Sequence, residues 1–364
     1  MTKTVRTGNR EFALPFIWCA LMIAMSLSGV AQTVEGLPSY KPEQKVSGSI
    51  RVWGHGNSKD DYIKSLVVAW ENDFRRYQPG VHFDNTLLGT AAAIGSLYEG
   101  TGDIAVMGRE IWPEEIEAFE EVKHYPPLGI DILTGSLDIR NKDYALVVFV
   151  HRNNPITKLS LQDLDAIFGC EHRRASKTAR TWGDLGLKGE WADKPIHVYG
   201  YEISRGFGYY FQQVVFKGGS RWNPELQEFG DLRQPDGSML DAGQRILDAL
   251  GKDPYGIAYS SLKYSNPNAK PVALGDEQGD FYSATKETVF QRKYPLTRTI
   301  TAFINRDPAQ PTDPKTREFL RYILCREGQQ QVLNDGGYLP LTAEAADAQR
   351  KKLKVYKRTD TEPR

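Results

Sequence analysis

The sequence predicts an α/β protein of two lobes with a ligand cleft between them. Short apolar segments of strand character alternate with longer amphipathic segments of helical periodicity along most of the chain, which is typical of α/β folds. Glycine-rich turns follow predicted strands in both halves of the chain, near Gly89 and near Gly206. In open α/β sheets such turns lie at the carboxyl ends of the strands, where ligands bind. Two such turns in separate halves therefore indicate two walls of one cleft.

Composition fits an ordinary globular protein. The chain has 364 residues, of which 40% are hydrophobic and 25% are charged, enough for one large or two medium domains with cores of their own. Lys plus Arg and Asp plus Glu each total 46, so the net charge provides no general attraction to nucleic acid or to a membrane. We therefore expect no nucleic-acid partner, and any anion site must be local.

Residues 1–31 are expected to be an export signal. Three basic side chains precede an apolar run at 13–27, and small residues at 29–31 offer a signal peptidase site. An uncleaved membrane anchor is the alternative, because the apolar run almost reaches a bilayer-spanning length. The protein is thus expected to be periplasmic or otherwise exported. Residues 32–48 are polar and contain proline, which predicts a flexible leader.

The first predicted strand, at 49–53, leads into a loop that contains Gly56, Asn57 and Ser58. His55 in this loop is either a loop histidine without a role or a ligand contact, and no second histidine stands at zinc-ligand spacing. A helix with one apolar face is predicted at 60–77.

The stretch 85–110 carries the first candidate anion site. A strand at 81–87 ends here, a tight turn follows at Gly89 and Thr90, and a helix with small residues in its first turn is predicted at 91–98. The first amides of a helix lack intrahelical acceptors and lie at the positive end of the helix dipole. The small side chain of Ala91 would let an oxyanion reach those amides, and the Thr90 hydroxyl would add a donor.

Arg109 follows another predicted strand, at 103–107. It is either a ligand contact or the partner of a nearby carboxylate, from Asp103 or from the acidic helix that starts near Trp112. The glutamates of that helix are interpreted as a solvated face rather than as a metal or catalytic site.

The second candidate site is the loop 200–208, where Ser204, Arg205 and Gly206 precede an aromatic-rich helix. A guanidinium group can pair with an oxyanion through its planar fork of donors. Cys170 and Cys325 could form a disulfide in an oxidising compartment or remain two buried thiols.

The remaining elements continue the alternation of predicted strands and helices. Residues 346–364, at the end of the chain, are expected to be a charged tail without a core face. The predicted strands lie at 125–132, 143–150, 195–199, 255–260, 272–274 and 299–304, and the predicted helices at 159–168, 239–250 and 316–333. The strand at 143–150 is apolar throughout, as expected for a strand buried on both faces.

Several motifs resemble, in the same order, those of the PstS-like phosphate-binding proteins of bacterial phosphate ABC transporters. They are EGTGDIA at 99–105, WGDLG at 182–186, YGIAY at 255–259, YPLTR at 294–298 and GGYLPL at 336–341. The resemblance covers roughly residues 50–342. It implies a two-lobed periplasmic binding protein-like fold of type II, with lobe one at 49–144 and 300–345, lobe two at 145–299, and two crossing strands.

The same resemblance implies that the protein captures phosphate for an ABC transporter permease, as a monomer without a cofactor. The implied ligand contacts come from the first loop, from Thr90, Ala91 and Arg109, and from the loop 200–208. The chain departs from the family pattern in that loop, because Tyr201 stands where an arginine is expected and Phe207 replaces a threonine. The alternative is therefore a binder or sensor of another oxyanion or of a small organic anion, without a role in transport. No catalytic motif is found, so an enzyme is not expected.

Overall fold

The computed structural model of the protein describes residues 1–2, 33–56, 61–139, 142–175 and 177–354. Most of the expected export signal, the loop residues Asn57 and Ser58, and the end of the expected tail lie outside these ranges. Within the described ranges, none of the helices combines the length and the apolarity that a bilayer crossing requires.

Lobe one is built around a five-stranded sheet with helices on both faces. The strand order is β2 (Gly80–Thr86), β1 (Ser47–Gly54), β3 (Ile104–Met107), β15 (Thr299–Ile304) and β4 (Leu128–Thr134). β1 pairs in parallel with β2 and β3, whereas β15 runs antiparallel to β3 and β4. A strand from the C-terminal part of the chain is thus inserted into a sheet made by the N-terminal part.

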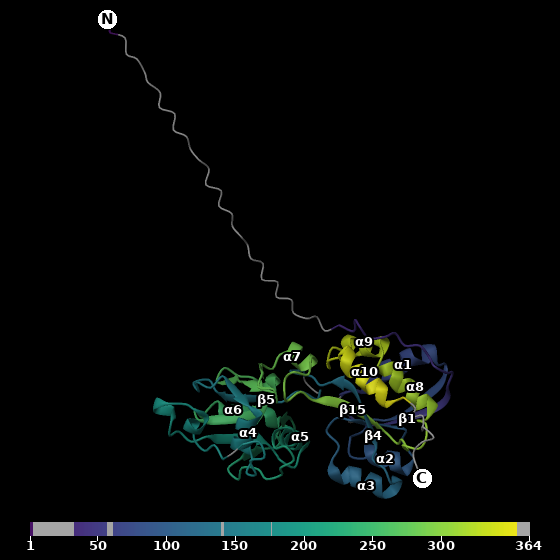
Figure 1. Ribbon diagram of the computed structural model, residues 1–364, viewed down its shortest axis with the longest axis horizontal. Coiled ribbons are helices and arrows are strands. Elements are labelled where there is room, and N and C mark those ends of the chain that lie inside the picture. Colours follow the sequence, from purple (N-terminus) through teal and green to yellow (C-terminus); the bar gives the residue numbers. More distant parts are fainter. Residues whose placement is uncertain (3–32, 57–60, 140–141, 176, 355–364) are drawn as a thin grey trace. The chain divides into compact units, whose positions relative to one another are not determined.

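The two faces of this sheet bury different helices, because alternate residues of a strand point to opposite sides. Ile104 and Val106 of β3 belong to one core cluster, and Ala105 and Met107 to another. The first cluster is covered by α1 (Lys64–Tyr77), α8 (Pro314–Ile323), α9 (Arg326–Asp335) and α10 (Ala343–Lys352). The second is covered by α2 (Ala93–Glu99) and α3 (Pro113–Lys123), which lie on the other side of the sheet in Figure 1.

Lobe two has its own five-stranded sheet and core. Its strand order is β12 (Ala269–Pro271), β5 (Val147–His151), β11 (Gly256–Ser260), β7 (His197–Tyr201) and β8 (Gln227–Phe229). The helices of this lobe are α4 (Leu161–Phe168), α5 (Gly206–Val215), α6 (Ala242–Leu250) and α7 (Lys286–Phe290). Every residue of β5 is buried, which agrees with the apolar strand predicted at 143–150.

Smaller elements complete lobe two. β14 (Phe281–Tyr282), β13 (Ala273–Gly275) and β6 (Lys158–Ser160) form a three-stranded sheet, and β10 (Met239–Leu240) pairs with β9 (Leu232–Arg233). Three short 3₁₀ helices lie at Trp182–Leu185, Gly189–Trp191 and Leu262–Tyr264.

Two segments carry the chain between the lobes, one after β4 and one before β15. They are joined by backbone hydrogen bonds from Gly135 N to Arg298 O at 2.9 Å and from Leu146 N to Leu296 O at 3.1 Å. A pair of adjacent crossing segments can act as a hinge, because few backbone dihedrals need to change when the lobes move. The predicted α/β fold of two lobes with a double crossing is confirmed.

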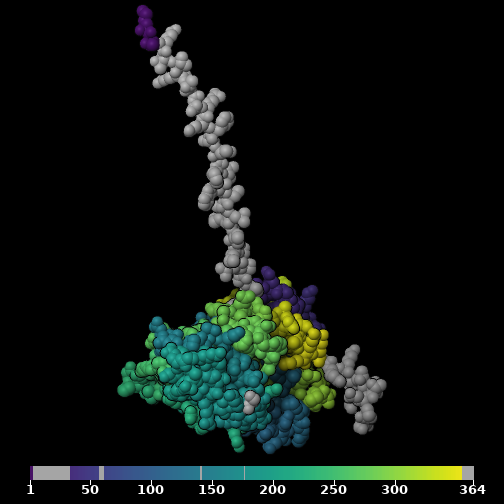
Figure 2. Space-filling view, turned by 60° about the vertical axis from the view of Figure 1, so that its left-hand side comes forward, coloured from purple at the N-terminus to yellow at the C-terminus, as the bar shows by residue number. Residues whose placement is uncertain are grey.

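The expected flexible leader is wrong for the residues that the structure describes. Val34, Leu37 and Tyr40 are buried in the core of lobe one, and the purple segment lies beside the yellow C-terminal helices in Figure 2. Apolar side chains at every third position among polar ones form a narrow apolar stripe. Because most residues of the segment are polar, its composition did not indicate this apolar face.

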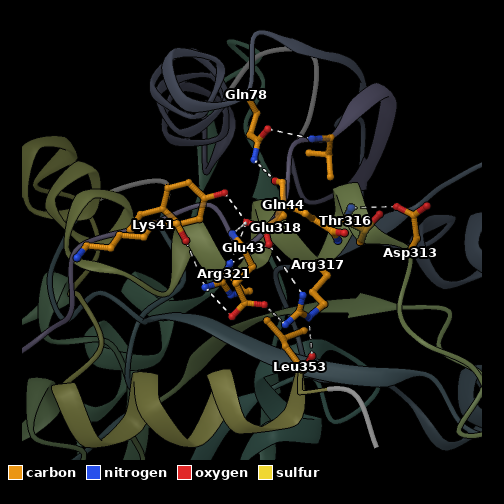
Figure 3. Close-up of polar contacts among 12 residues, drawn as sticks. Lys41, Glu43, Gln44, Gln78, Asp313, Thr316, Arg317, Glu318, Arg321 and Leu353 are labelled. Atoms are coloured by element: carbon orange, nitrogen blue, oxygen red, sulfur yellow. Dashed lines mark hydrogen bonds and ion pairs between the residues drawn. The ribbon is translucent and has the colours of Figure 1, made fainter. Parts of the chain in front are cut away.

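A buried carboxylate holds this leader in place. Glu318 of α8 is fully buried, and its Oε2 accepts a hydrogen bond from the Tyr40 hydroxyl at 2.6 Å. Arg321 pairs with Glu318 at 2.8 Å and with Glu43 of the leader at 3.0 Å. Figure 3 shows this cluster together with Arg317. The leader is therefore part of lobe one rather than a tether.

Replacement of Tyr40 by phenylalanine is expected to lower the free energy of unfolding by about 1.5–3 kcal/mol. The change removes a hydrogen bond to a charged group and leaves a buried carboxylate oxygen without that donor. Urea unfolding measures the effect. Tyr77→Phe is the matched control, because Tyr77 is 37% exposed and loss of its hydroxyl should cost less than about 0.5 kcal/mol. Equal effects of the two substitutions would contradict the role given to Tyr40.

Two further expectations need correction. The tail from residue 346 onward was expected to lack a core face, yet Ala346 and Leu353 are buried and Arg350 donates to Leu324 O at 2.7 Å. The helix predicted at 316–333 is two helices, because Cys325 adopts an extended backbone between α8 and α9. Both features depend on tertiary contacts that periodicity along the chain does not report.

Candidate functional site

A cavity of about 670 Å³, here called the interlobe cavity, is lined by residues of both lobes and of the first crossing segment. Four of the predicted ligand contacts line it, namely Gly56, Thr90, Tyr201 and Arg205. Arg205 also borders a second hollow, of about 600 Å³, together with Arg109, Ser204 and Gly206. Ala91 instead lines a separate hollow of lobe one, of about 350 Å³. The two loops singled out in the sequence thus meet at one place.

The lobe-one wall depends on a close approach of two loops. Gly54, at the end of β1, has a φ of +129°, and its carbonyl accepts a hydrogen bond from Gly89 N at 3.0 Å. His55 N donates to Val106 O of β3 at 2.8 Å. These bonds place Gly56 and Thr90 beside each other at the carboxyl ends of neighbouring parallel strands, where ligand sites of α/β sheets occur.

The helix of the first candidate anion site begins later than predicted. α2 starts at Ala93, and Thr90 O accepts from Ala93 N at 3.0 Å. No side-chain hydrogen bond caps this helix. Ala91 and Ala92 therefore belong to a turn that precedes α2, and the Thr90 hydroxyl makes no capping hydrogen bond to this helix.

Arg109 is engaged within lobe one. Its two terminal nitrogens each lie 2.7 Å from a carboxylate oxygen of Glu115, and its guanidinium carbon lies 3.8 Å from the ring centroid of Trp112. Of the two interpretations left open for Arg109, the structure shows the salt bridge with the acidic helix. Asp103, the other expected partner, pairs with Arg51 at 2.7 Å.

A buried charge cluster lies between the cavity and the hinge. His55 Nε2 lies 2.7 Å from Asp143 Oδ2. Arg298 of the second crossing segment pairs with Glu110 at 3.0 Å and lies 3.9 Å from Asp143. Burial alone would raise the pKa of Asp143, but His55, Arg298 and the Tyr338 hydroxyl lower it below its usual value. Asp143 is therefore a structural anion of this cluster.

Tyr201 occupies the position at which the resembling family carries an arginine. Its hydroxyl lies 3.2 Å from that of Tyr144 and 3.4 Å from Ser260 Oγ, and Ser260 donates to Gly243 O at 3.0 Å. Burial raises the pKa of Tyr201 to about 12, so the side chain is neutral at physiological pH. Tyr201 lines the cavity without supplying a positive charge.

Arg205 supplies a charge at the mouth of the cavity. It is the N-cap residue of α5, and its Nε lies 2.9 Å from Glu202 Oε2. The side chain of Arg205 is 76% exposed, so it is free to change its rotamer. Ser204 and Gly206 flank it at the N-terminus of the same helix.

Sequence reasoning missed several polar residues of the cavity, namely Lys142, Tyr144, Asp241, Lys263 and Tyr264. Lys263 and Tyr264 follow β11, which is a parallel neighbour of β7. The rule that ligands bind at the carboxyl ends of parallel strands is a signal that could have found them. Among the described residues, no cluster of three or more His, Cys, Asp or Glu side chains could hold a metal ion.

The two cysteines of the described ranges are free thiols, so the disulfide alternative is wrong. Cys325 is buried, whereas Cys170 is exposed. Burial raises the pKa of the Cys325 thiol to about 11, which keeps it protonated and unreactive at neutral pH.

Comparisons with known proteins agree with this architecture. The chain matches the family model of a PBP superfamily domain over residues 41–327. The phosphate-binding protein PstS of Pseudomonas aeruginosa is 32% identical over 329 residues, which cover 90% of this chain and 93% of the relative.

Two solved structures show the fold. PstS from Borrelia burgdorferi has a TM-score of 0.52 at 17% identity, covering 82% of this chain and 100% of that chain. An ABC-type phosphate transport receptor from Vibrio cholerae has a TM-score of 0.50 at 16% identity, covering 80% of this chain and 100% of that chain. Since the family model spans most of the sequence and the Pseudomonas relative is similar over nearly its whole length, this chain belongs to the PstS family of phosphate-binding proteins within the PBP superfamily.

Proposed function

We propose that this protein captures inorganic phosphate in the interlobe cavity and presents it to the membrane permease of an ABC transporter. The observation that carries the proposal is a cavity lined by both lobes in a chain that is 32% identical to the PstS phosphate-binding protein of Pseudomonas aeruginosa. The motifs that resemble binding proteins of phosphate ABC transporters support the transporter as the partner.

The proposed mechanism is closure of the lobes around the anion. Lobe one would offer the loops at Gly56 and Thr90, and lobe two would offer Ser204, Arg205 and Gly206. Donors on two walls are satisfied by one small ligand only when the walls approach each other, so the ligand favours the closed state by its differential affinity. A permease that binds the closed form could then distinguish loaded from empty protein.

A second candidate function is the binding of another oxyanion or of a small organic anion. The observation in its favour is Tyr201, which is neutral and stands where the family pattern has an arginine. A cavity with one fewer fixed positive charge would hold a multiply charged anion less strongly.

A ligand screen by thermal unfolding tests both candidates. We expect phosphate to raise the melting temperature, because a ligand that binds only the folded state adds about 2.7 kcal/mol of stability at 100 times its Kd. Arsenate, sulfate, molybdate and organic phosphates are compared at the same concentrations. A response to an organic anion without any response to phosphate would favour the second candidate over the first.

We also propose that the protein is an exported, monomeric binding protein without catalytic activity, with lobe boundaries close to residues 144 and 300. A phosphoester hydrolysis assay on the purified protein tests the absence of catalysis. N-terminal sequencing of the mature protein tests cleavage after the expected signal, and sedimentation tests the monomer.

A further inference from the structure

The pairing of β7 with β11 in the lobe-two sheet places Lys263 at the interlobe cavity. β7 and β11 are neighbouring parallel strands, so their carboxyl ends lie at the same edge. β7 ends at Tyr201, and β11 is followed by the 3₁₀ helix Leu262–Tyr264. Tyr201, Lys263 and Tyr264 therefore line the same cavity.

The ammonium group of Lys263 is held by two neighbours and keeps a donor. Its Nζ lies 3.2 Å from Asp241 Oδ2 and 3.1 Å from the Tyr264 hydroxyl oxygen. The Tyr264 hydroxyl in turn donates to Asp241 Oδ2 at 2.9 Å. An ammonium group has three N–H donors, and these contacts account for two of them within the part of the chain that the structure describes. The ammonium nitrogen also lies 4.4 Å from the centroid of the Tyr264 ring, and the third N–H has no hydrogen-bond acceptor among the described residues, so it is available to a ligand.

Other candidate cations near the cavity differ from Lys263. Lys142 donates to Tyr62 O and pairs with Asp335 at 3.2 Å, and Arg109 is paired with Glu115 through both terminal nitrogens. Arg205 has spare donors, but its side chain is 76% exposed, against 18% for Lys263. A mostly buried ammonium interacts more strongly with an anion than an exposed guanidinium does, because water screens it less.

The hydroxyls beside Lys263 cannot replace the missing cation. Ser260 donates its hydroxyl proton to Gly243 O. The Tyr201 hydroxyl is hydrogen-bonded to Ser260 Oγ or to the Tyr144 hydroxyl oxygen. Tyr264 donates its own proton to Asp241. An anion in this part of the cavity therefore has Lys263 as its charged donor.

We propose that Lys263 is a ligand-binding cation of the interlobe cavity that replaces the arginine absent at Tyr201, with Asp241 and Tyr264 as its positioning residues. The inference rests on the proposed capture of an oxyanion. Asp241 also precedes α6 as its N-cap residue, so the positive end of the helix dipole stabilises this carboxylate and weakens its repulsion of the ligand.

Titration calorimetry with inorganic phosphate tests this role on the full chain. We expect Lys263→Met to weaken phosphate binding ~10- to 100-fold, as loss of one charge-assisted hydrogen bond predicts. Lys252→Met is the matched control, because Lys252 is an exposed lysine of the same lobe outside the cavity. It should bind phosphate within about twofold of the unchanged protein.

A double variant distinguishes a direct contact between Lys263 and the ligand from repulsion of the ligand by an unpaired Asp241. Lys263→Met leaves Asp241 without its partner, and that carboxylate alone could repel the anion. Lys263→Met combined with Asp241→Asn should remain at least ~10-fold weaker than the unchanged protein if Lys263 donates to the ligand. Recovery of full affinity in the double variant would overturn the inference, and so would unchanged affinity in the single variant. In both cases the proposed function would stand. Absence of phosphate binding by the unchanged protein would instead remove the proposed function and this inference together.

Discussion

Replacement of Arg298 by methionine is expected to lower the free energy of unfolding by about 3–5 kcal/mol, the cost of leaving a buried charge without its partner. The side chain of Arg298 is 2% exposed. Its Nε and Nη2 lie 3.1 Å and 3.0 Å from the two carboxylate oxygens of Glu110, and its Nη2 lies 3.3 Å from Gly108 O. Methionine preserves much of the apolar volume but removes every one of these donors.

The Arg298→Met substitution should weaken contacts in both lobes. Arg298 pairs with Glu110 of lobe one, and its guanidinium carbon lies 5.0 Å and 5.3 Å from the ring centroids of Phe207 and Tyr210 of lobe two. Tyr210 also donates to Thr297 O at 2.7 Å. Loss of the guanidinium therefore weakens contacts on both sides of the crossing segment.

Urea unfolding at neutral pH, followed by tryptophan fluorescence, measures the loss. Arg76→Met is the control, because its ion pair with Asp73 has an arginine that is 79% exposed, and exposed pairs contribute about 0–1 kcal/mol. A loss below about 1 kcal/mol for Arg298→Met would show that the carboxylates of Glu110 and Asp143 find other partners.

The pH dependence provides a second measurement on the same variant. Asp143 has its pKa lowered in the folded state by His55, Arg298 and Tyr338, against the effect of burial. A carboxylate with a depressed folded pKa stabilises the fold above its unfolded pKa, about 3.9, and that contribution is lost as the pH falls through the folded pKa. The unchanged protein and Arg298→Met differ in their free energy of unfolding, and Asp143 contributes to this difference. That contribution should shrink below about pH 4.

Local patterns predicted most elements of the fold. The helix predicted at 159–168 is observed as α4, where Ser160 is the N-cap residue and its Oγ accepts from Asp163 N at 3.1 Å. The buried strand β5 followed from an unbroken apolar run. Such features depend on neighbours within a few residues, so a single sequence contains the information that determines them.

Features that depend on distant partners were not predictable in the same way. Tyr40 and Glu318 are 278 residues apart, and without that contact the leader resembles any polar linker. The position of Lys263 in the cavity likewise depends on the parallel pairing of β7 with β11. A strand assignment alone does not reveal which strands become neighbours, so the rule that ligands bind at the carboxyl ends of parallel strands leads to Lys263 only when this pairing is known.

Replacement of Gly54 by alanine is expected to lower the free energy of unfolding by about 3 kcal/mol, because steric overlap and backbone strain each contribute. An added Cβ would overlap Val106 O and would lie 2.9 Å from its carbonyl carbon. Val106 belongs to β3 in the middle of the lobe-one sheet, so its backbone cannot move without breaking pairs with β1 or β15. The φ of +129° adds strain for any residue with a Cβ.

Gly89→Ala is the matched control that separates the two causes. Gly89 has a φ of +149°, but an added Cβ would meet nothing within 4 Å. Its substitution should therefore cost only the strain, about 1 kcal/mol. Urea unfolding of the two variants measures the difference. A clear excess for Gly54→Ala would show that contact with β3 makes glycine necessary where β1 enters the cavity loop. Equal losses of unfolding free energy would mean that the β3 backbone shifts to accommodate the added Cβ. The close approach of β1 to β3, which positions Gly56, would then be less rigid than the hydrogen bond from His55 N to Val106 O indicates.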